Sequence, residues 1–213
     1  MAGRGRPRQF SIDEVLDGAL ALIEAEGVGA LSMQALAERL GTGPATLYNY
    51  VRSRDELIDL MLGRALAQQP PVPRPGSRED WAEQVTDYLL ALFRDGVRRP
   101  ALLQLWHQRP QLHLGTALRG EEELRSLEQV GFSPTRAAEV YRILSSQLLG
   151  HIASAAVVAQ RPDTLVIEAD STLGGAQRHL DQIGEEQIYE LALRALIRGF
   201  AAELEDIREE RKR

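Results

Sequence analysis

A glycine-rich turn between two short helical patterns, within residues 31–50, restricts the fold of this chain more than any other sequence feature. The first pattern follows Ser32, a residue type that caps helix N-termini, and it repeats leucine at a helical spacing. Residues 41–43 end this pattern, and Pro44 stands where a second helix has its first residue, a position that needs no backbone donor. The segment therefore predicts a helix-turn-helix.

The expected second helix runs from Pro44 to about Tyr50 and has one apolar edge. Leu47 and Val51 lie one helical turn apart, so both can pack against the first helix. The side chains left outside are small, polar or aromatic, and such a surface suits a groove of DNA. This outward set is Ala45, Thr46, Tyr48, Asn49 and Tyr50. An ordinary helical hairpin, whose exposed tyrosines and asparagine bind nothing, is the alternative.

Positive charge gathers around this segment although the chain as a whole is acidic. Three arginines and no acid occur from Arg39 to Arg54, whereas the formal net charge of the 213 residues is -6. Since this charge is local rather than compositional, it indicates contacts with phosphate groups.

Residues 1–9 form a flexible basic arm ahead of the first helical pattern. Arg4, Arg6 and Arg8 fall in a stretch without any side chain that could form a core. An extended arm of this kind can place arginine in the minor groove of A·T-rich DNA, where the negative potential is strongest. A solvated terminus without a partner is the alternative.

From Phe10 to about Leu66 the chain resembles the DNA-binding domain of the tetracycline-repressor (TetR) family of bacterial regulators. The Gly-Arg-Pro composition of the arm is similar to arms that precede this domain in many members. The residues that carry the resemblance cover a little over a quarter of the chain. They are the first-helix run Ile12, Val15, Leu16, Ala19, Leu20 and Ile23, then Glu26 and Gly27, residues 31–33, residues 37–41, residues 46–51 and residues 54–57.

The resemblance implies two classes of DNA contact. Phosphate contacts fall on Ser32, Tyr48, Tyr50 and Arg54. Base contacts fall on Gln34, Pro44, Ala45, Thr46 and Asn49; asparagine can bind adenine bidentately, and alanine or a threonine methyl can pack on thymine. Gln34 departs from the family, where many members carry Lys or Arg, which implies one phosphate contact fewer or a base contact in its place.

The rest of the chain predicts only helices, so the fold class is all-α, with about nine or ten helices in total. We expect a helix-turn-helix DNA-binding domain over residues 10–54 and a helical ligand-binding and dimerisation domain over residues 55–213. Prolines in residues 70–77 forbid helix and predict an extended connection. The helices expected are about 55–69, 79–97, 100–107, 114–130, 134–159, 172–183 and 185–210.

Two of these helices are expected to form a homodimer interface. In the family the matching pair meets its symmetry mate as a four-helix bundle, and a helix-turn-helix binds palindromic half-sites in pairs. The candidate interface residues are Leu144, Leu148, Ile152, Ala155, Ile188, Leu191, Ala192, Ala195, Leu196 and Gly199. The alternative is that one of the two apolar stripes belongs to the core of the monomer.

A pocket for a small molecule requires a few polar groups among apolar walls. Aromatic and polar residues on otherwise apolar helices are the candidates: Tyr88, Phe93, Trp106, His107, Gln147 and His151. Each could instead belong to the core, the surface or the dimer interface. Glu121, Glu122 and Glu123 are interpreted as a solvated face.

Composition excludes several classes of protein. The chain has no cysteine, no histidine or carboxylate set with metal-ligand spacing, and no phosphate-binding glycine loop or nucleophile elbow, so we expect no metal, no cofactor and no enzymatic activity. No apolar run approaches the ~18 residues of a membrane span.

The prediction is a ligand-responsive transcriptional regulator, most simply a repressor that a small, apolar molecule releases from a palindromic double-stranded operator. It would act in the bacterial cytoplasm, at the nucleoid. The alternative is a helical protein that binds a ligand or a partner and keeps only vestigial DNA contacts.

Overall fold

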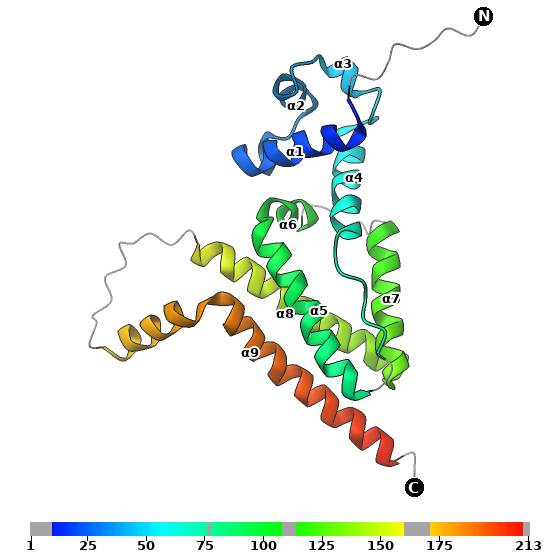
Figure 1. Cartoon of the computed structure of the whole chain (residues 1–213), viewed down its shortest axis with the longest axis vertical. Helices are drawn as coiled ribbons and strands as arrows, with labels where there is room; N and C mark the ends of the chain where they lie inside the picture. Colours follow the sequence, from blue (N-terminus) through cyan, green and yellow to red (C-terminus); the bar gives the residue numbers. More distant parts are fainter. Residues whose placement is uncertain (1–9, 76–77, 108–113, 160–170, 211–213) are drawn as a thin grey trace, which may run out of the picture. The chain divides into compact units, whose positions relative to one another are not determined.

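The computed structural model describes residues 10–75, 78–107, 114–159 and 171–210, and within these ranges every regular element is a helix (Figure 1). The all-helical fold expected from the sequence is thereby confirmed. The chain forms two compact units. The N-terminal unit comprises Met1–Gln68 and Ala101–His113, and the C-terminal unit comprises Gln69–Pro100 and Leu114–Arg213.

The N-terminal unit begins with α1 (Ile12–Glu26), whose start is fixed by a capping box. Ser11 Oγ accepts the backbone N–H of Glu14, and the Glu14 carboxylate accepts the backbone N–H of Ser11, which satisfies two donors that a helix start leaves open. Gly27 ends the helix at φ 84°, in the left-handed region that glycine tolerates. A short 3-10 turn (Val28–Ala30) then leads to the next helix.

The helix-turn-helix consists of α2 (Met33–Arg39) and α3 (Pro44–Leu47). Ser32 caps α2, since its Oγ accepts the backbone N–H of Ala35 at 3.1 Å. Gly41 turns the chain at φ 65°, and the N–H of Thr42 donates to Ala37 O at 2.9 Å. The α3 helix is shorter than expected and ends at Leu47 rather than near Tyr50.

Two further helices complete the N-terminal core. The helix α4 (Arg54–Ala67), capped by Ser53, and α6 (Pro100–His107) bury apolar side chains in the same cluster as α1 and α2. Buried side chains from α4 and α6 include Leu57, Ile58, Met61, Leu62, Leu102 and Leu105. The functional division expected between residues 54 and 55 stays a prediction.

The C-terminal unit begins with an extended segment, residues 69–75, which we call the strap. It continues with α5 (Arg78–Arg98), α7 (Leu114–Val130), α8 (Pro134–Val158) and α9 (Thr172–Glu210). Aromatic rings fill much of the core between these helices: Trp81 lies edge to face with Phe132, and Phe93 stacks on Tyr189 with centroids 4.8 Å apart.

Two backbone features shape this unit. The α9 helix is bent at Gly184, whose φ of 72° and ψ of 164° are not helical, so residues 172–183 and 185–210 are separate helical segments, as the sequence predicts. At Gly96 the backbone of α5 lies against Ile152 of α8, and a Cβ atom there would meet Ile152 Cδ1 at 2.5 Å. No helix in the described part of the chain is long and apolar enough to cross a membrane.

Candidate functional site

The surface of α3 follows from the burial of one side chain. Leu47 is completely buried in the N-terminal core, which turns the opposite face of this short helix outward. Tyr48 is 53% exposed, and Ala45 and Asn49 are also exposed, whereas Pro44 and Thr46 are partly covered. The structure thus leaves Ala45 on α3 and Asn49, two residues beyond its end, exposed beside Tyr48.

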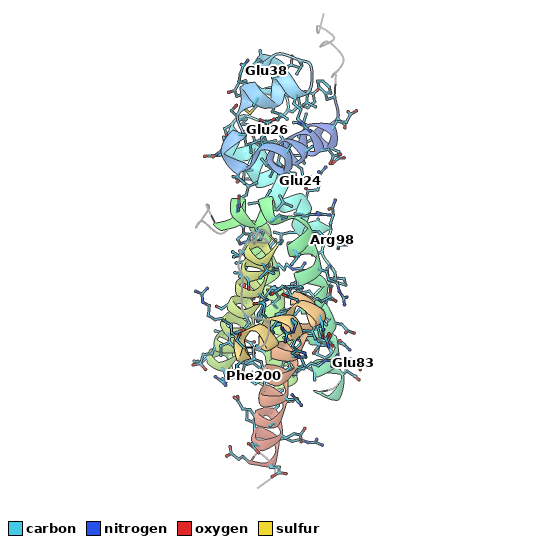
Figure 2. All side chains as sticks on the ribbon, turned by 90° about the vertical axis from the view of Figure 1, so that its left-hand side faces the viewer. Glu24, Glu26, Glu38, Glu83, Arg98 and Phe200 are labelled. Atoms are coloured by element: carbon cyan, nitrogen blue, oxygen red, sulfur yellow. The ribbon has the colours of Figure 1, made fainter. Side chains whose placement is uncertain are left out.

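Gln34, on α2, has its side-chain amide engaged. Its Nε2 donates to Glu38 Oε1 at 2.7 Å, and both side chains are exposed. The amide is therefore oriented by a carboxylate on the same helix before any DNA is bound. Glu38 lies on α2, and two other exposed acids, Glu24 and Glu26, lie near the C-terminal end of α1 (Figure 2).

Tyr50 and Arg54, two of the phosphate contacts that the resemblance implies, make bonds within the N-terminal unit. Tyr50 Oη accepts the backbone N–H of Phe10 at 2.8 Å. Arg54 Nε donates to the carbonyl of Leu31 at 2.7 Å, just before the N-cap of α2. Arg54 is half-buried, while its neighbour Arg52 has an exposed side chain that can reach a phosphate.

Three acidic residues of α1, Asp13, Glu14 and Asp17, form ion pairs or hydrogen bonds within the N-terminal unit. Arg64 of α4 lies 2.5 Å from Asp17 and 3.5 Å from Asp13, measured between its Nη atoms and the nearest carboxylate oxygens. The hydrogen bonds from Ser11 lower the pKa of Glu14, so this carboxylate stays charged in the capping box. Glu14 is thus engaged with Ser11, and Asp13 and Asp17 are engaged with Arg64 of α4.

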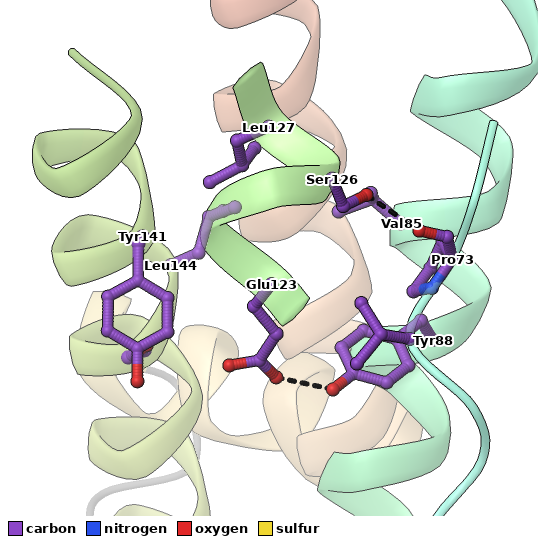
Figure 3. A pocket seen from close by; sticks show the side chains of 10 residues that line it. Pro73, Val85, Tyr88, Glu123, Ser126, Leu127, Tyr141 and Leu144 are labelled. Carbon is purple, nitrogen blue, oxygen red and sulfur yellow. Dashed lines mark hydrogen bonds between the residues drawn. The ribbon is translucent and has the colours of Figure 1, made fainter. Parts of the chain in front are cut away.

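A cavity of about 50 Å³ lies in the C-terminal unit between the strap, α5, α7 and α8 (Figure 3). Apolar side chains form most of its wall, and two tyrosines, a glutamate and two serines supply polar atoms. The lining residues are Val72, Pro73, Val85, Tyr88, Glu123, Ser126, Leu127, Tyr141, Leu144 and Ser145.

The main polar group at this cavity is a cluster of Tyr88, which is buried, with Glu123 and Arg119, which are partly covered. The Tyr88 hydroxyl donates to Glu123 Oε1, and Arg119 Nη2 and Nε donate to the same hydroxyl oxygen at 2.9 and 3.1 Å (Figure 3 shows the first bond). Burial raises the pKa of Glu123 and that of Tyr88, the latter further because of the nearby Glu123 charge. The interpretation of residues 121–123 as a solvated face therefore holds for Glu121 and Glu122 and is wrong for Glu123.

The strap is held by side chains of α7. Four of its residues are prolines, which have no backbone N–H, so these residues cannot donate backbone hydrogen bonds. Instead Arg119 Nη2 donates to Pro70 O at 2.7 Å, and Ser126 Oγ donates to Pro73 O at 2.6 Å. Arg119 consequently joins the strap and the Tyr88 cluster.

The other ligand-binding candidates lie in several places. Phe93 and His151 meet around the buried ring of Tyr189, with the His151 centroid 5.1 Å away. Gln147 is exposed. Trp106 packs against the core of the N-terminal unit and so does not line the C-terminal cavity; the side chain of His107 lies outside the described part.

Sequence reasoning named Tyr141, which lines the cavity, but missed Tyr189, Arg119 and Glu123 as neighbours of these groups. Tyr189 Oη and Trp81 Nε1 are buried and have no hydrogen-bond partner among the described residues. Helical spacing could not predict the contact of Phe93 with Tyr189 or that of Tyr88 with Glu123, because each joins residues far apart in sequence.

The candidate dimer residues divide into buried and exposed sets. Leu144, Ile152 and Ala155 are buried inside the chain itself, so part of the α8 stripe belongs to the monomer core. On α9, Leu191 is 58% exposed, Ala195 and Gly199 are exposed, and Ile188, Ala192 and Leu196 are partly covered, as is Leu148 on α8. The face available to a partner therefore lies mainly on α9.

Two further expectations concern the arm and metals. Arg4, Arg6 and Arg8 lie outside the described residues. Among the residues that are described, no group of His, Cys, Asp and Glu could hold a metal ion.

Comparison with known proteins adds an independent finding. Residues 15–61 match the family model described as bacterial regulatory proteins, tetR family. The class E tetracycline repressor of Escherichia coli is 27% identical over 205 residues, which cover 93% of this chain and 94% of that protein. The transcriptional repressor DrrR1 of Streptomyces coeruleorubidus is 38% identical over 129 residues, covering 58% of this chain and 45% of that protein.

A solved structure shares the architecture of both units. The TetR family protein ActR of Streptomyces coelicolor, in complex with actinorhodin, has a TM-score of 0.67 and 27% identity, covering 92% of this chain and 98% of that one.

The bond between Arg54 and Leu31 yields a stability prediction. Arg54→Ala should lower the free energy of unfolding by about 1–3 kcal/mol, because the Leu31 carbonyl loses its charged donor at the start of α2. Arg52→Ala removes an exposed side chain and should change it by less than about 0.5 kcal/mol. Urea titrations followed by circular dichroism measure both, and equal stability of the two variants would contradict a structural role for Arg54.

Proposed function

Because the chain belongs to the tetR family of bacterial regulatory proteins, we propose that it is a repressor that binds double-stranded operator DNA and releases it when a small molecule binds. The observation that carries the proposal is the outer face of α3. Buried Leu47 holds this helix in place, and the exposed Tyr48 and Asn49 follow it directly in the chain. Arg64 pairs with both Asp13 and Asp17 and offsets part of their negative charge.

In the proposed complex α3 lies in the major groove. Asn49 binds a base edge, and Ala45 and the Thr46 methyl contact thymine methyl groups, with Pro44 and Gln34 at the border of this surface. Ser32 and Tyr48 bind phosphates on either side, and Arg52 adds a charge contact. Arg54 contributes mainly by holding the start of α2, since its Nε is already bonded to Leu31 O.

The protein acts as a homodimer in this proposal. A single helix-turn-helix covers one half-site, and two half-sites one helical turn apart require two copies. The exposed apolar face of α9, with Leu191 and Ala195, offers a surface for a second copy, and a two-fold axis would place the same patch on both subunits.

The effector site is proposed to be the cavity beneath the strap. ActR binds actinorhodin in a structure similar to this chain, which supports a small-molecule site in the same kind of helical unit. Typical ligand pockets have ~300–1,000 Å³, so the present cavity of about 50 Å³ must enlarge. Apolar walls with the Tyr88 and Glu123 pair favour a mainly apolar molecule that carries a hydrogen-bonding group.

Enlargement most easily involves the strap. The side chains of Arg119 and Ser126 hold two of its carbonyls, and its four prolines have no N–H to donate. The strap follows the C-terminal end of α4 directly in the chain, so a displacement of the strap acts on the end of the helix that packs in the N-terminal core. By linkage, DNA binding and effector binding then weaken each other equally.

The base-reading role of Asn49 can be tested with duplexes that the wild-type protein selects from a random pool. Asn49→Ala should weaken binding by about fivefold to a hundredfold and relax the preference at one base pair, because one bidentate contact is lost. Gln129→Ala, an exposed change on α7, is the control and should bind like wild type. Fluorescence anisotropy measures the affinities, and an unchanged Asn49→Ala would refute this use of α3.

The dimer proposal predicts that Leu191→Asp is monomeric at concentrations at which the wild type is dimeric, since it places a charge in the apolar face of α9. Its affinity for a palindromic duplex should fall by at least about tenfold. Leu118→Asp, which alters an exposed leucine on α7, should stay dimeric. Sedimentation velocity distinguishes these outcomes. A dimeric Leu191→Asp would refute the assignment of the interface to this face of α9.

The strap proposal predicts that Ser126→Ala weakens DNA binding by about twofold to tenfold without any effector, because the conformation that holds Pro73 O loses one hydrogen bond. Ser145→Ala makes the same chemical change at the same cavity without touching the strap, and should bind DNA normally. Equal affinities of the two variants for DNA would show that the strap does not control DNA binding.

A further inference from the structure

Phe10 and Tyr50 lie 40 positions apart in the sequence and meet at the surface of the N-terminal unit. The backbone N–H of Phe10 donates to Tyr50 Oη at 2.8 Å. Their rings pack edge to face with centroids 6.4 Å apart, and both rings lie partly buried against the core. The first described residue of the chain is therefore bound to Tyr50, three residues after the end of α3, the helix proposed to lie in the major groove and called the recognition helix below.

Tyr50 is in turn fixed to α3. Its backbone N–H donates to Leu47 O at 2.9 Å, and the N–H of Val51 donates to the same carbonyl at 3.1 Å. Leu47 is the side chain that anchors α3 in the core. A displacement of α3 thus carries Tyr50 with it.

The next residue after Phe10 is held separately. The backbone N–H of Ser11 donates to Glu14 at 2.6 Å within the capping box of α1. The capping box fixes the backbone of Ser11 relative to α1 only. The bond between Phe10 and Tyr50 fixes Phe10 relative to the segment that follows α3. The Tyr50 hydroxyl does not cap α1, because it accepts the N–H of Phe10, which precedes the N-cap Ser11.

We propose that Tyr50 is a positioning residue that sets where the basic arm, residues 1–9, departs relative to the recognition helix. This inference rests on the proposed DNA binding. At ~3.5 Å per extended residue, Arg8, Arg6 and Arg4 can lie at most about 7, 14 and 21 Å from Phe10. Neighbouring grooves are half a turn, or about 17 Å, apart along the duplex, so a fixed departure point keeps the arginines within reach of the minor groove beside α3.

This role differs from the phosphate contact that the resemblance implies for Tyr50. A direct phosphate contact acts whether or not the arm is present. A positioning role acts through Phe10, so it disappears when there is no arm to position. The two roles therefore make opposite predictions for a double-mutant cycle.

The test compares Tyr50→Phe in the full chain and in a chain lacking residues 2–8, on the duplex that the wild type selects from a random pool. Tyr50→Phe keeps the ring and removes only the hydroxyl. In the full chain it should weaken binding about threefold to tenfold, and in the arm-deleted chain by less than about 1.5-fold. Tyr48→Phe, which removes a hydroxyl from an exposed ring of the same segment, is the matched control and should weaken both chains equally.

Two results would overturn the inference: an equal loss for Tyr50→Phe in both backgrounds, which assigns the hydroxyl to a phosphate, or no loss in either. A wild-type chain that selects no duplex would instead refute the proposed function. A readout without DNA keeps the two apart. Hydrogen exchange of the Phe10 amide, followed by NMR, should be slow in the wild type and at least about threefold faster in Tyr50→Phe, and equal rates would overturn the anchor itself.

Discussion

Burial of Leu47 is the interaction on which the outer surface of the N-terminal unit depends. A helix of only Pro44–Leu47 has no stability of its own, because nucleation costs more than one turn returns. It persists because Leu47 enters the core and because Gly41 allows the turn that precedes it. The outward direction of Ala45, Tyr48 and Asn49 depends on this inward side chain, so the proposed DNA surface requires an intact N-terminal core.

In the C-terminal unit the equivalent constraint comes from the prolines of the strap. Its four prolines have no backbone N–H and prevent a helix, and two of its carbonyls are bound by the side chains of Arg119 and Ser126. Because Arg119 also binds the Tyr88 hydroxyl, one guanidinium is shared between the cavity wall and the strap. Arg119 therefore links the position of the strap to one wall of the cavity.

Local signals predicted the helices well, since Ser32, Ser53 and Ser133 cap helices in the structure and Gly41 and Gly184 take positive φ. Contacts between distant residues left no such signal. Periodicity could not show that Glu123 faces Tyr88, that Trp106 packs on the N-terminal core or that Arg54 bonds Leu31. The α8 stripe also shows why a pattern of apolar residues cannot separate a monomer core from an interface: Leu144 and Ile152 are buried without any partner chain.

The bend at Gly184 has a mechanical consequence. An unbroken helix over Thr172–Glu210 would be a rod of about 58 Å at 1.5 Å per residue, and any tilt at one end would be carried to the other. The non-helical backbone at Gly184 interrupts the ladder of hydrogen bonds, and Arg94 of α5 binds Glu186 at the start of the second segment. Residues 185–210 are held in the C-terminal unit by their own buried side chains, including Tyr189, Leu193 and Ile197, so the face that carries Leu191 does not depend on a continuous helix through residues 172–183.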